Sequence, residues 1–210
     1  MKLYDADWAP SPRRVRIFLA EKGVEIERVK VDLRNDEHFG DAYLAINPRG
    51  VVPALQLDDG EVICESAAIC RYIEALHPEP SLFGTSPLAT GRIESWTRRI
   101  ENDGYAAAVY AFRNGSPRME GRGQPGKGPV VPLIPELVTR GAIMWRAFID
   151  ALDQRLATTP WIAGDDYSFA DITALVPVDF AARAKLVVPE GHAQLSRWHQ
   201  AATARPSATA

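Results

Sequence analysis

The sequence is short of the residues that build disulfide scaffolds and metal sites. Its 210 residues include two cysteines, Cys64 and Cys70, and four histidines. The cysteines are not spaced as C-x-x-C, and a single pair is too few to hold a chain of this length together. We therefore expect both to be small, buried apolar side chains. Because the histidines show neither H-x-x-x-H nor H-E-x-x-H spacing, we expect no metal site.

The sequence also lacks blocks of positive charge and long apolar runs. The formal net charge is −3, and lysines and arginines are spread along the chain. Nucleic-acid binding needs clustered positive charge, so we expect no such partner. A membrane span needs about 20 apolar residues, whereas the most apolar stretch, 170–182, contains Asp171 and Pro177. Asp5 and Asp7 stand where a secretory signal needs an apolar stretch. We therefore expect a soluble, cytoplasmic protein without a membrane partner.

The N-terminal part of the sequence alternates between strand and helix patterns. Strands are predicted at 2–6, 24–33, 51–57 and 61–64, and helices at 11–22, 36–46 and 66–76. Ser11 and Ser66 are each expected to be the N-cap of a helix, and Asp58-Asp59-Gly60 is typical of a hairpin turn. A βαβ unit followed by a hairpin and a helix predicts a mixed four-stranded sheet in the thioredoxin arrangement.

After a linker at 80–87, strand patterns stop. Helices are predicted over 88–113, over 136–156 and from 169 onward. A loop rich in glycine and proline, 114–135, interrupts them, and loops of that length in a folded domain are usually functional or mobile. Ser168 and Asp171 are spaced as a capping box at the last of these helices. The sequence thus predicts an α/β domain at 1–79 followed by an all-helical domain at 88–210.

The pair Glu65-Ser66 stands where a predicted strand meets a predicted helix. A helix N-terminus presents N–H groups and the positive end of the helix dipole, which suit a carboxylate. The carboxylate of Glu65 beside it suits an ammonium group. Together the two residues suit the head of an α-amino acid, although a plain helix cap beside a surface acid explains them as well.

Two further features also have both a functional and a plain explanation. Pro53 cannot donate to a sheet ladder. A cis Val52–Pro53 bond would turn the backbone of Val52 outward, where it could pair with an extended peptide, but an edge proline needs no ligand. Ser11, at the start of a helix, could help to stabilise a thiolate, or could simply cap the helix.

Four ordered segments resemble cytosolic glutathione transferases of a bacterial type. They are RRVRIFLAEKGVEIERVKVDL, NPRGVVPALQLDDGEVICESAAICRYIEALHP, WIAGDDYSFADITALVPVDFAARA and WHQAATARPSA. ESAAICRYI resembles the family's glutathione-anchoring motif, and SFAD resembles its capping motif in the helical domain. The resemblance covers nearly the whole chain. It implies a homodimeric enzyme that joins the thiolate of glutathione, its co-substrate, to an electrophilic small molecule without a metal.

The resemblance also implies roles for individual residues. Glu65 and Ser66 hold the γ-glutamyl head, and Val52 before Pro53 pairs with the cysteinyl backbone. The first helix N-terminus activates the thiol, and Ser11 is the candidate for a hydrogen bond to the sulfur. The electrophile is expected against the long helix that follows the linker. Its expected neighbours there are Tyr105, Tyr110, Phe112 and Arg113.

Two positions depart from the pattern of this family. Ala9 stands where relatives often carry Ser, Cys or Tyr, and Val51 stands where they usually carry the Lys or Gln that holds the glycyl carboxylate. Arg49, Arg13 and His38 are the expected substitutes at the glycyl end. The departures leave two alternatives open. One is a glutathione-dependent isomerase, dehalogenase or peroxidase on the same fold, and the other is a non-catalytic binding protein that kept the fold.

Overall fold

A four-stranded mixed sheet forms the centre of the first of two units into which the chain divides. The computed structural model describes all residues, 1–210. The first unit comprises Met1–Pro80, Pro125–Pro129 and Thr209–Ala210, and the second comprises Ser81–Gln124 and Val130–Ala208. The predicted α/β domain was 1–79 and the predicted helical domain was 88–210. The helical domain as predicted therefore includes Pro125–Pro129 and Thr209–Ala210, which belong to the first unit in the structure.

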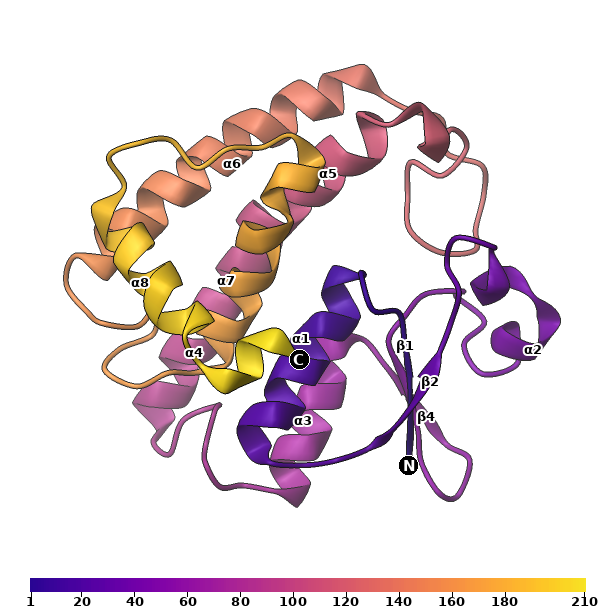
Figure 1. Cartoon of the computed structure of the whole chain (residues 1–210), viewed down its shortest axis with the longest axis horizontal. Helices are drawn as coiled ribbons and strands as arrows, with labels where there is room; N and C mark the ends of the chain where they lie inside the picture. The colour runs from indigo at the N-terminus through magenta and orange to yellow at the C-terminus, as the bar shows by residue number, and fades with distance from the viewer. The chain divides into compact units, whose positions relative to one another are not determined.

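The sheet has the strand order β2-β1-β3-β4, and β1, β2 and β4 are labelled in Figure 1. Its strands are β1 Lys2–Asp5, β2 Glu27–Lys30, β3 Ala54–Gln56 and β4 Val62–Cys64. β1 pairs in parallel with β2 and antiparallel with β3, and β3 pairs antiparallel with β4. This topology confirms the predicted βαβ unit followed by a hairpin. The strands predicted over 24–33 and 51–57 were too long. In the second case the ladder begins only after Pro53, which has no N–H to donate.

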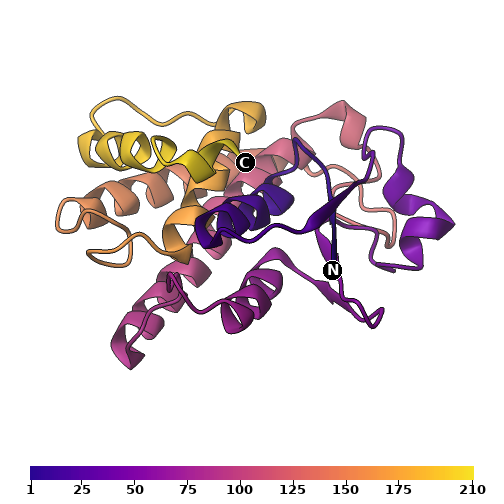
Figure 2. The ribbon, with the colours of Figure 1, turned by 60° about the horizontal axis from the view of Figure 1, so that its bottom comes forward.

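Three helices flank the sheet in the first unit. They are α1 Pro10–Lys22, α2 Asp41–Leu44 and α3 Ser66–Leu76, and a 3₁₀ turn, Glu37–Phe39, precedes α2. α1 and α3 lie side by side, whereas α2 lies beyond the strands from them (Figure 2). The core between these elements is closed to solvent. Leu3, Val15, Phe18, Leu55, Ile69 and Ile73 are each 0% exposed. This burial fixes α1 and α3 against the sheet, together with the residues at their N-termini.

The start of α1 differs from the prediction. The helix begins at Pro10 with Ala9 as its N-cap, so the prediction of Ser11 as the cap was wrong. Pro10 and Pro12 have no N–H, and the N–H of Ala9 donates to the carbonyl of Ala6 at 3.0 Å. Of the positions whose N–H groups a helix start leaves without an intrahelical acceptor, two are prolines and Ala9 donates to Ala6. With so few donors to satisfy, this start needs no side-chain cap.

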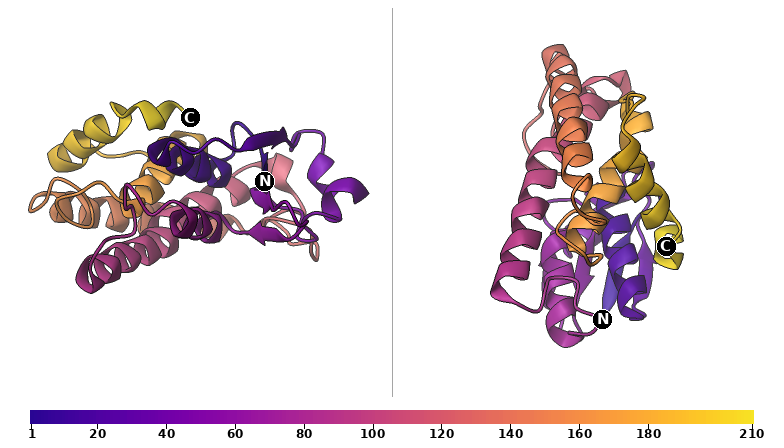
Figure 3. Two further views of the ribbon diagram at one scale, coloured as in Figure 1. Left: turned by 90° about the horizontal axis from the view of Figure 1, so that it is seen from below. Right: turned by 90° about the vertical axis from the view of Figure 1, so that its left-hand side faces the viewer.

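The second unit consists of helices. They are α4 Pro87–Arg99, α5 Ala106–Asn114, α6 Pro135–Leu156, α7 Phe169–Phe180 and α8 Ala193–Thr203, and 3₁₀ turns occur at Pro117–Met119, Ala181–Ala184 and Pro206–Thr209. α5 and α6 run alongside each other (Figure 3). A π-helical segment, Ile100–Tyr105, joins α4 to α5, so the helix predicted over 88–113 changes its winding midway. α7 and α8 both lie in the region predicted to be helical from 169 onward. None of the helices combines the length and apolarity needed to cross a bilayer.

Asp171 ties three parts of the second unit together. Its carboxylate accepts hydrogen bonds from the backbone N–H and the hydroxyl of Ser168, both at 3.0 Å, which confirms the predicted capping box. It also accepts from the N–H of Ile162 and from Nε1 of Trp198, both at 2.9 Å. Asp171 and Trp198 are both 0% exposed. The start of α7, the loop before it and α8 are therefore held by one buried side chain.

Candidate functional site

The start of α3 is open for an anion. Glu65 is the N-cap of α3 and Ser66 is its first residue, so the N-cap lies one residue before the predicted one. Glu65 has a left-handed backbone, with φ 70° and ψ 119°, which is strained for a residue with a side chain. The carbonyl of Glu65 accepts the first helical bond, from Ile69 at 3.0 Å, and no side chain caps the helix. The N–H groups from Ser66 to Ala68 therefore have no intrahelical acceptor.

Arg14 of α1 reaches the side chain of Ser66. Its Nε lies 3.1 Å and its Nη2 2.7 Å from Ser66 Oγ, and both donate to it. Both residues are buried, with Arg14 6% and Ser66 4% exposed. Because Ser11 lies about one helical turn before Arg14, the starts of α1 and α3 are neighbours. A guanidinium thus lies directly behind the predicted carboxylate site.

The carboxylate of Glu65 also has a cationic neighbour. Nη1 of Arg49 forms an ion pair with Oε1 of Glu65, and both side chains are mostly exposed. The sequence predicted that Arg49 would serve the glycyl end of the ligand. The structure instead places its guanidinium on the residue predicted to take the amine of the γ-glutamyl head.

The turn that carries Arg49 is fixed by side chains around it. The carbonyl of Val51 accepts from the hydroxyl of Tyr43 at 2.6 Å and from Nδ2 of Asn47 at 2.8 Å. Oδ1 of Asn47 in turn accepts from the N–H of Arg49 at 3.1 Å. Burial raises the pKa of Tyr43, so its hydroxyl stays protonated and remains a donor. Residues 47–51 therefore form a rigid approach to Val52.

Val52 and Pro53 follow that turn, and the bond between them is cis, as the functional hypothesis required. Val52 lies outside the paired register of β3, which begins at Ala54. His38 adjoins the same turn, because a Cβ on Gly50, whose φ is +58°, would lie 3.0 Å from the carbonyl oxygen of His38. The structure thus places Val52 and Pro53 directly after the 47–51 turn and the backbone of His38 beside Gly50 in it.

Matches to two domain families and to one relative decide the family of the chain. Residues 8–76 match the family described as glutathione S-transferase, N-terminal domain, and residues 146–206 match glutathione S-transferase, C-terminal domain. The chain is 37% identical over 211 residues to glutathione S-transferase 2 of Saccharomyces cerevisiae, an alignment that covers 99% of this chain and 87% of that protein. The chain belongs to the glutathione S-transferase family.

Two further comparisons support the same conclusion. The chain is 34% identical to maleylacetoacetate isomerase of Pseudomonas aeruginosa, over 99% of this chain and 93% of that one. The crystal structure of Gtt2 from Saccharomyces cerevisiae has a TM-score of 0.88 at 35% identity, over 99% of this chain and 98% of that one. These findings confirm the predicted family and the predicted fold, a thioredoxin-like domain followed by an all-helical domain.

The residues predicted to line the electrophile pocket of this glutathione S-transferase family member do not share one helix face. Tyr105 ends the π-helical segment, and Tyr110, Phe112 and Arg113 belong to α5. Tyr110 and Phe112 are two residues apart, which places them roughly 160° apart around the helix. The ring of Phe112 packs edge-on against that of Phe180, with centroids 5.0 Å apart. Phe112 is therefore engaged in packing within the second unit.

The loop predicted at 114–135 is closed at its base. Nη1 of Arg113 donates to the carbonyl of Arg122 at 2.9 Å. Arg122 and Val131 form a β-bridge, and Oδ1 of Asn114 accepts from the N–H of Ile134 at 2.9 Å. The predicted pocket residue Arg113 thus has a second task, which is to hold this loop in shape.

The tip of the loop, Pro125–Pro129, counts with the first unit and lies against the 47–51 turn. The N–H of Lys127 donates to the carbonyl of Arg49 at 2.7 Å. A Cβ on Gly126, whose φ is +90°, would lie 2.6 Å from that carbonyl oxygen and 2.9 Å from Cγ1 of Val51. Only glycine permits this approach. The loop tip therefore covers the position where relatives usually carry a polar side chain.

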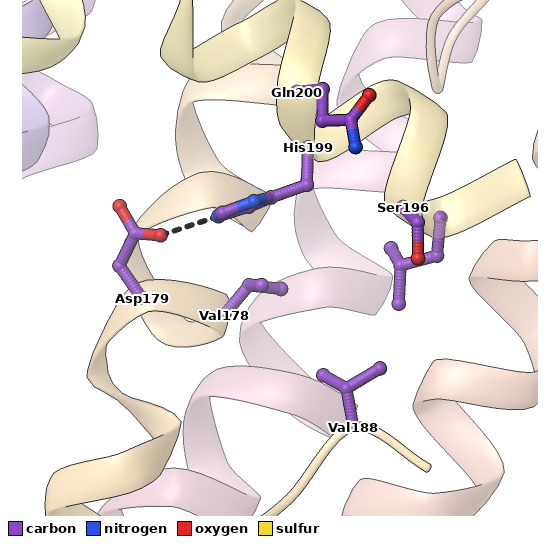
Figure 4. Close-up of a pocket in the computed structure, with 7 residues that line it drawn as sticks. Val178, Asp179, Val188, Ser196, His199 and Gln200 are labelled. Carbon is purple, nitrogen blue, oxygen red and sulfur yellow. Dashed lines mark hydrogen bonds and ion pairs between the residues drawn. The ribbon is translucent and has the colours of Figure 1, made fainter. Parts of the chain in front are cut away.

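A pocket of about 470 Å³ lies wholly within the second unit (Figure 4). Its lining includes Ser196, His199 and Asp179, the residue types of a hydrolytic triad. Nε2 of His199 lies 2.6 Å from Oδ1 of Asp179. The hydroxyl of Ser196, however, donates to the carbonyl of His192 at 2.9 Å. Since a triad needs a hydrogen bond from serine to histidine, this group is not arranged for nucleophilic catalysis.

Sequence reasoning missed three contributors to the candidate site. Arg14 stands among several arginines near the start of α1, and nothing in the sequence marks it as the one directed at Ser66. Tyr43 was treated only as part of a weak helix, and Lys127 only as part of a loop. Asn47 shows the tendency of asparagine to bond the backbone two residues on, since its Oδ1 accepts from the N–H of Arg49. No three His, Cys, Asp or Glu side chains gather where they could hold a metal ion.

Proposed function

We propose that this protein is a glutathione S-transferase that binds glutathione at the start of α3 and joins its sulfur to an electrophilic small molecule. In the reaction the thiolate forms a carbon–sulfur bond and the electrophile loses a leaving group, such as halide. The observation that carries the proposal is the uncapped N-terminus of α3 with Glu65 beside it. The family of the chain supports the same chemistry.

The head of the ligand has the most complete site. The carboxylate of the γ-glutamyl head accepts from the N–H groups at the start of α3 and from the hydroxyl of Ser66. Its ammonium group binds the carboxylate of Glu65 in place of Arg49. A helix N-terminus and a buried serine favour the carboxylate, and an exposed acid favours the amine.

The middle of the ligand lies along Val52. The backbone N–H and C=O of Val52 pair with the cysteinyl residue as an added strand, beside Pro53. The sulfur then faces the start of α1, where Ser11 is the proposed hydrogen-bond donor. A hydrogen bond and a positive helix end stabilise a thiolate, which is the nucleophile, relative to a thiol whose pKa is about 8.5. Thiol activation and positioning of the reactants are the contribution of the protein.

The other candidate residues serve the glycyl end of glutathione and the electrophile. His38 adjoins the 47–51 turn and serves the glycyl carboxylate, with Arg49 as a second cation once Glu65 has bound the amine. Tyr105, Tyr110 and Arg113 face the electrophile, and Phe112 shapes that surface through its packing on Phe180. No metal takes part. We further propose that the protein is a cytoplasmic homodimer that binds neither membranes nor nucleic acids.

A second function is favoured by one specific relative. Maleylacetoacetate isomerase of Pseudomonas aeruginosa aligns over nearly the whole chain. In a glutathione-dependent isomerase the thiolate adds to an unsaturated acid and leaves again, so the same binding corner is used without net consumption of glutathione. Ala9 and Val51 also keep a non-catalytic binding protein with the same fold as an alternative.

Three assays separate these functions. The full chain is passed over immobilised glutathione, assayed for conjugation of glutathione to an aryl halide, and assayed for cis–trans isomerisation of an unsaturated dicarboxylic acid. Retention with conjugation supports the transferase. Retention with isomerisation alone supports the isomerase, and the absence of both retention and turnover contradicts both enzymes and favours the non-catalytic protein.

A further inference from the structure

Arg14 takes up both lone pairs of the Ser66 hydroxyl. A serine oxygen has two acceptor sites and one proton. Nε–H and Nη2–H of Arg14 donate to Oγ of Ser66 at 3.1 and 2.7 Å. No acceptor capacity remains on Oγ, so the hydroxyl proton must be directed away from the guanidinium. In this state Ser66 can act only as a donor.

The environment strengthens that donor. Arg14 and Ser66 are both buried, and the interaction of a charge with a hydrogen bond grows where water is excluded. The cation polarises the hydroxyl, and the α3 N-terminus adds positive potential on the same side. A carboxylate placed there meets a hydroxyl that is already oriented, so little conformational freedom is lost on binding.

The geometry points to Arg14 as a positioning residue for glutathione, acting through Ser66 on the carboxylate of the γ-glutamyl head. This inference rests on the proposed glutathione site. Arg14 does not touch the ligand in this account. It fixes the direction of the Ser66 proton and supplies a fixed positive charge behind it. Selectivity for a ligand that carries an α-carboxylate then depends on an arginine in α1.

The test compares two ligands by calorimetry on the full chain. One is glutathione and the other is 4-aminobutyryl-cysteinyl-glycine, which lacks only the α-carboxylate. Arg14→Lys keeps the charge but cannot donate from two nitrogens to one oxygen in the same geometry. The loss of an oriented hydrogen bond to a charged group predicts roughly tenfold weaker glutathione binding. Binding of the analogue is expected to stay within about twofold of wild type, because it has no carboxylate to sense the change.

Arg16→Lys is the matched control. Arg16 lies two residues on in α1, is also buried, and pairs with Asp5 instead of Ser66, at 2.7 Å. Arg16→Lys measures the effect of replacing a buried arginine elsewhere on α1. We expect it to leave the affinities for glutathione and for the analogue unchanged. A second check uses Ser66→Ala. In that background Arg14→Lys should cost no further affinity, because its effect passes through the missing hydroxyl.

The outcomes separate this inference from the function on which it rests. If wild-type protein binds no glutathione, the proposed function fails. If wild type binds glutathione and Arg14→Lys binds it equally well, or loses both ligands equally, the positioning role of Arg14 is overturned. If Arg14→Lys weakens glutathione binding as much in the Ser66→Ala protein as in wild type, the positioning role is also overturned. A ligand-selective loss that vanishes in that background supports it.

Discussion

Arg49 and Glu65 form an ion pair beside the start of α3, although each was expected to bind a different end of the proposed ligand. The sequence assigned them to opposite ends of glutathione, Arg49 to the glycyl carboxylate and Glu65 to the γ-glutamyl amine. The structure joins them. An amine bound to Glu65 as proposed shares this carboxylate with Arg49, whose guanidinium pairs with Oε1, so Arg49 competes with the ligand for it.

Arg49→Gln is accordingly expected to strengthen glutathione binding. An exposed ion pair is worth up to about 1 kcal/mol, so affinity should rise by no more than about fivefold. Calorimetry at low salt measures the change, and Arg140→Gln, on the exposed face of α6, removes the same charge elsewhere. Weaker binding of Arg49→Gln alone would show that Arg49 contacts the glycyl carboxylate more than it competes for Glu65.

The sequence was sufficient for features that local chemistry specifies. The Asp-Gly turn, the capping box at Ser168 and the strand-to-helix corner at Glu65 all depend on residues close together in the chain. Each is found in the structure. The N-caps of α1 and α3 were misplaced by two residues and by one residue. At Pro10 and Pro12 the missing N–H groups removed the need for a cap, and propensity rules that look for serine cannot see this.

Contacts between residues far apart in the chain could not be predicted from the sequence. Arg14 and Ser66 are separated by 52 residues, and only the packing of α1 on α3 brings them together. The same applies to the loop tip at Lys127, which meets Arg49 through a backbone hydrogen bond. Such contacts follow from tertiary packing and leave no periodic signal in either segment.

Lys22 closes the C-terminal side of α3 with a buried charge. Its side chain is 0% exposed, forms an ion pair with Glu74 and donates to the carbonyls of His77 and Pro80 at 2.8 and 2.5 Å. Lys22→Met would leave a carboxylate and these carbonyls without their donor. We expect a loss of about 3 kcal/mol in the free energy of unfolding, measured in urea.

Lys30→Met is the control for that measurement. Lys30 also pairs with an acid, Asp7, but is largely exposed. Water replaces its partner, so the change should be much smaller than for Lys22. Equal effects of the two substitutions would show that burial of Lys22 does not determine its contribution.

Asp171 predicts a pH dependence of stability. Burial raises its pKa from 3.8 to about 6, against the opposing effect of the hydrogen bonds that it accepts. Between these two values the folded chain holds more proton than the unfolded chain, so the contribution of Asp171 to stability falls as pH rises. Above about pH 6 it is constant.

The measurement is the urea unfolding of wild type and Asp171→Asn between pH 4 and pH 7. The Asn variant does not titrate at this position. The stability of wild type relative to the variant should fall from pH 4 to pH 6 and then level off. A relative stability that rises over this range would mean that the hydrogen-bond donors outweigh burial and that the pKa is lowered.

His192 predicts a second pH window, in which stability again falls as pH rises. Its Nε2 lies 2.8 Å from Oδ1 of Asp150 and its Nδ1 lies 2.9 Å from the carbonyl of Pro189. Two acceptors favour the doubly protonated ring, and the hydrogen bond to Asp150 contributes most to raising the pKa of His192 above 6.5. Its stabilising contribution is full below pH 6.5 and is lost as pH rises through the raised pKa.

His192→Gln should therefore be less stable than wild type at pH 5.5 and should approach it at pH 8.5. Hydrogen exchange of the amides at the start of α8 measures the effect locally. Since Asp153 separately accepts from Gln194 and Leu195, both at 2.9 Å, α8 keeps its other anchor in this variant. A difference between the two proteins that does not change with pH would rule out the titration.

The most direct test of the central claim is calorimetric titration of glutathione into wild type, Ser66→Ala and Ser86→Ala. Ser86 is the true N-cap of α4, accepting from the N–H of Ala89 at 3.2 Å, so its loss should cost about 1 kcal/mol of stability and no affinity. Ser66→Ala removes the buried donor at the start of α3 and should weaken binding tenfold or more, by roughly the worth of a hydrogen bond to a charge. Unchanged affinity in Ser66→Ala, with wild type binding normally, would contradict the assignment of this corner to the γ-glutamyl head.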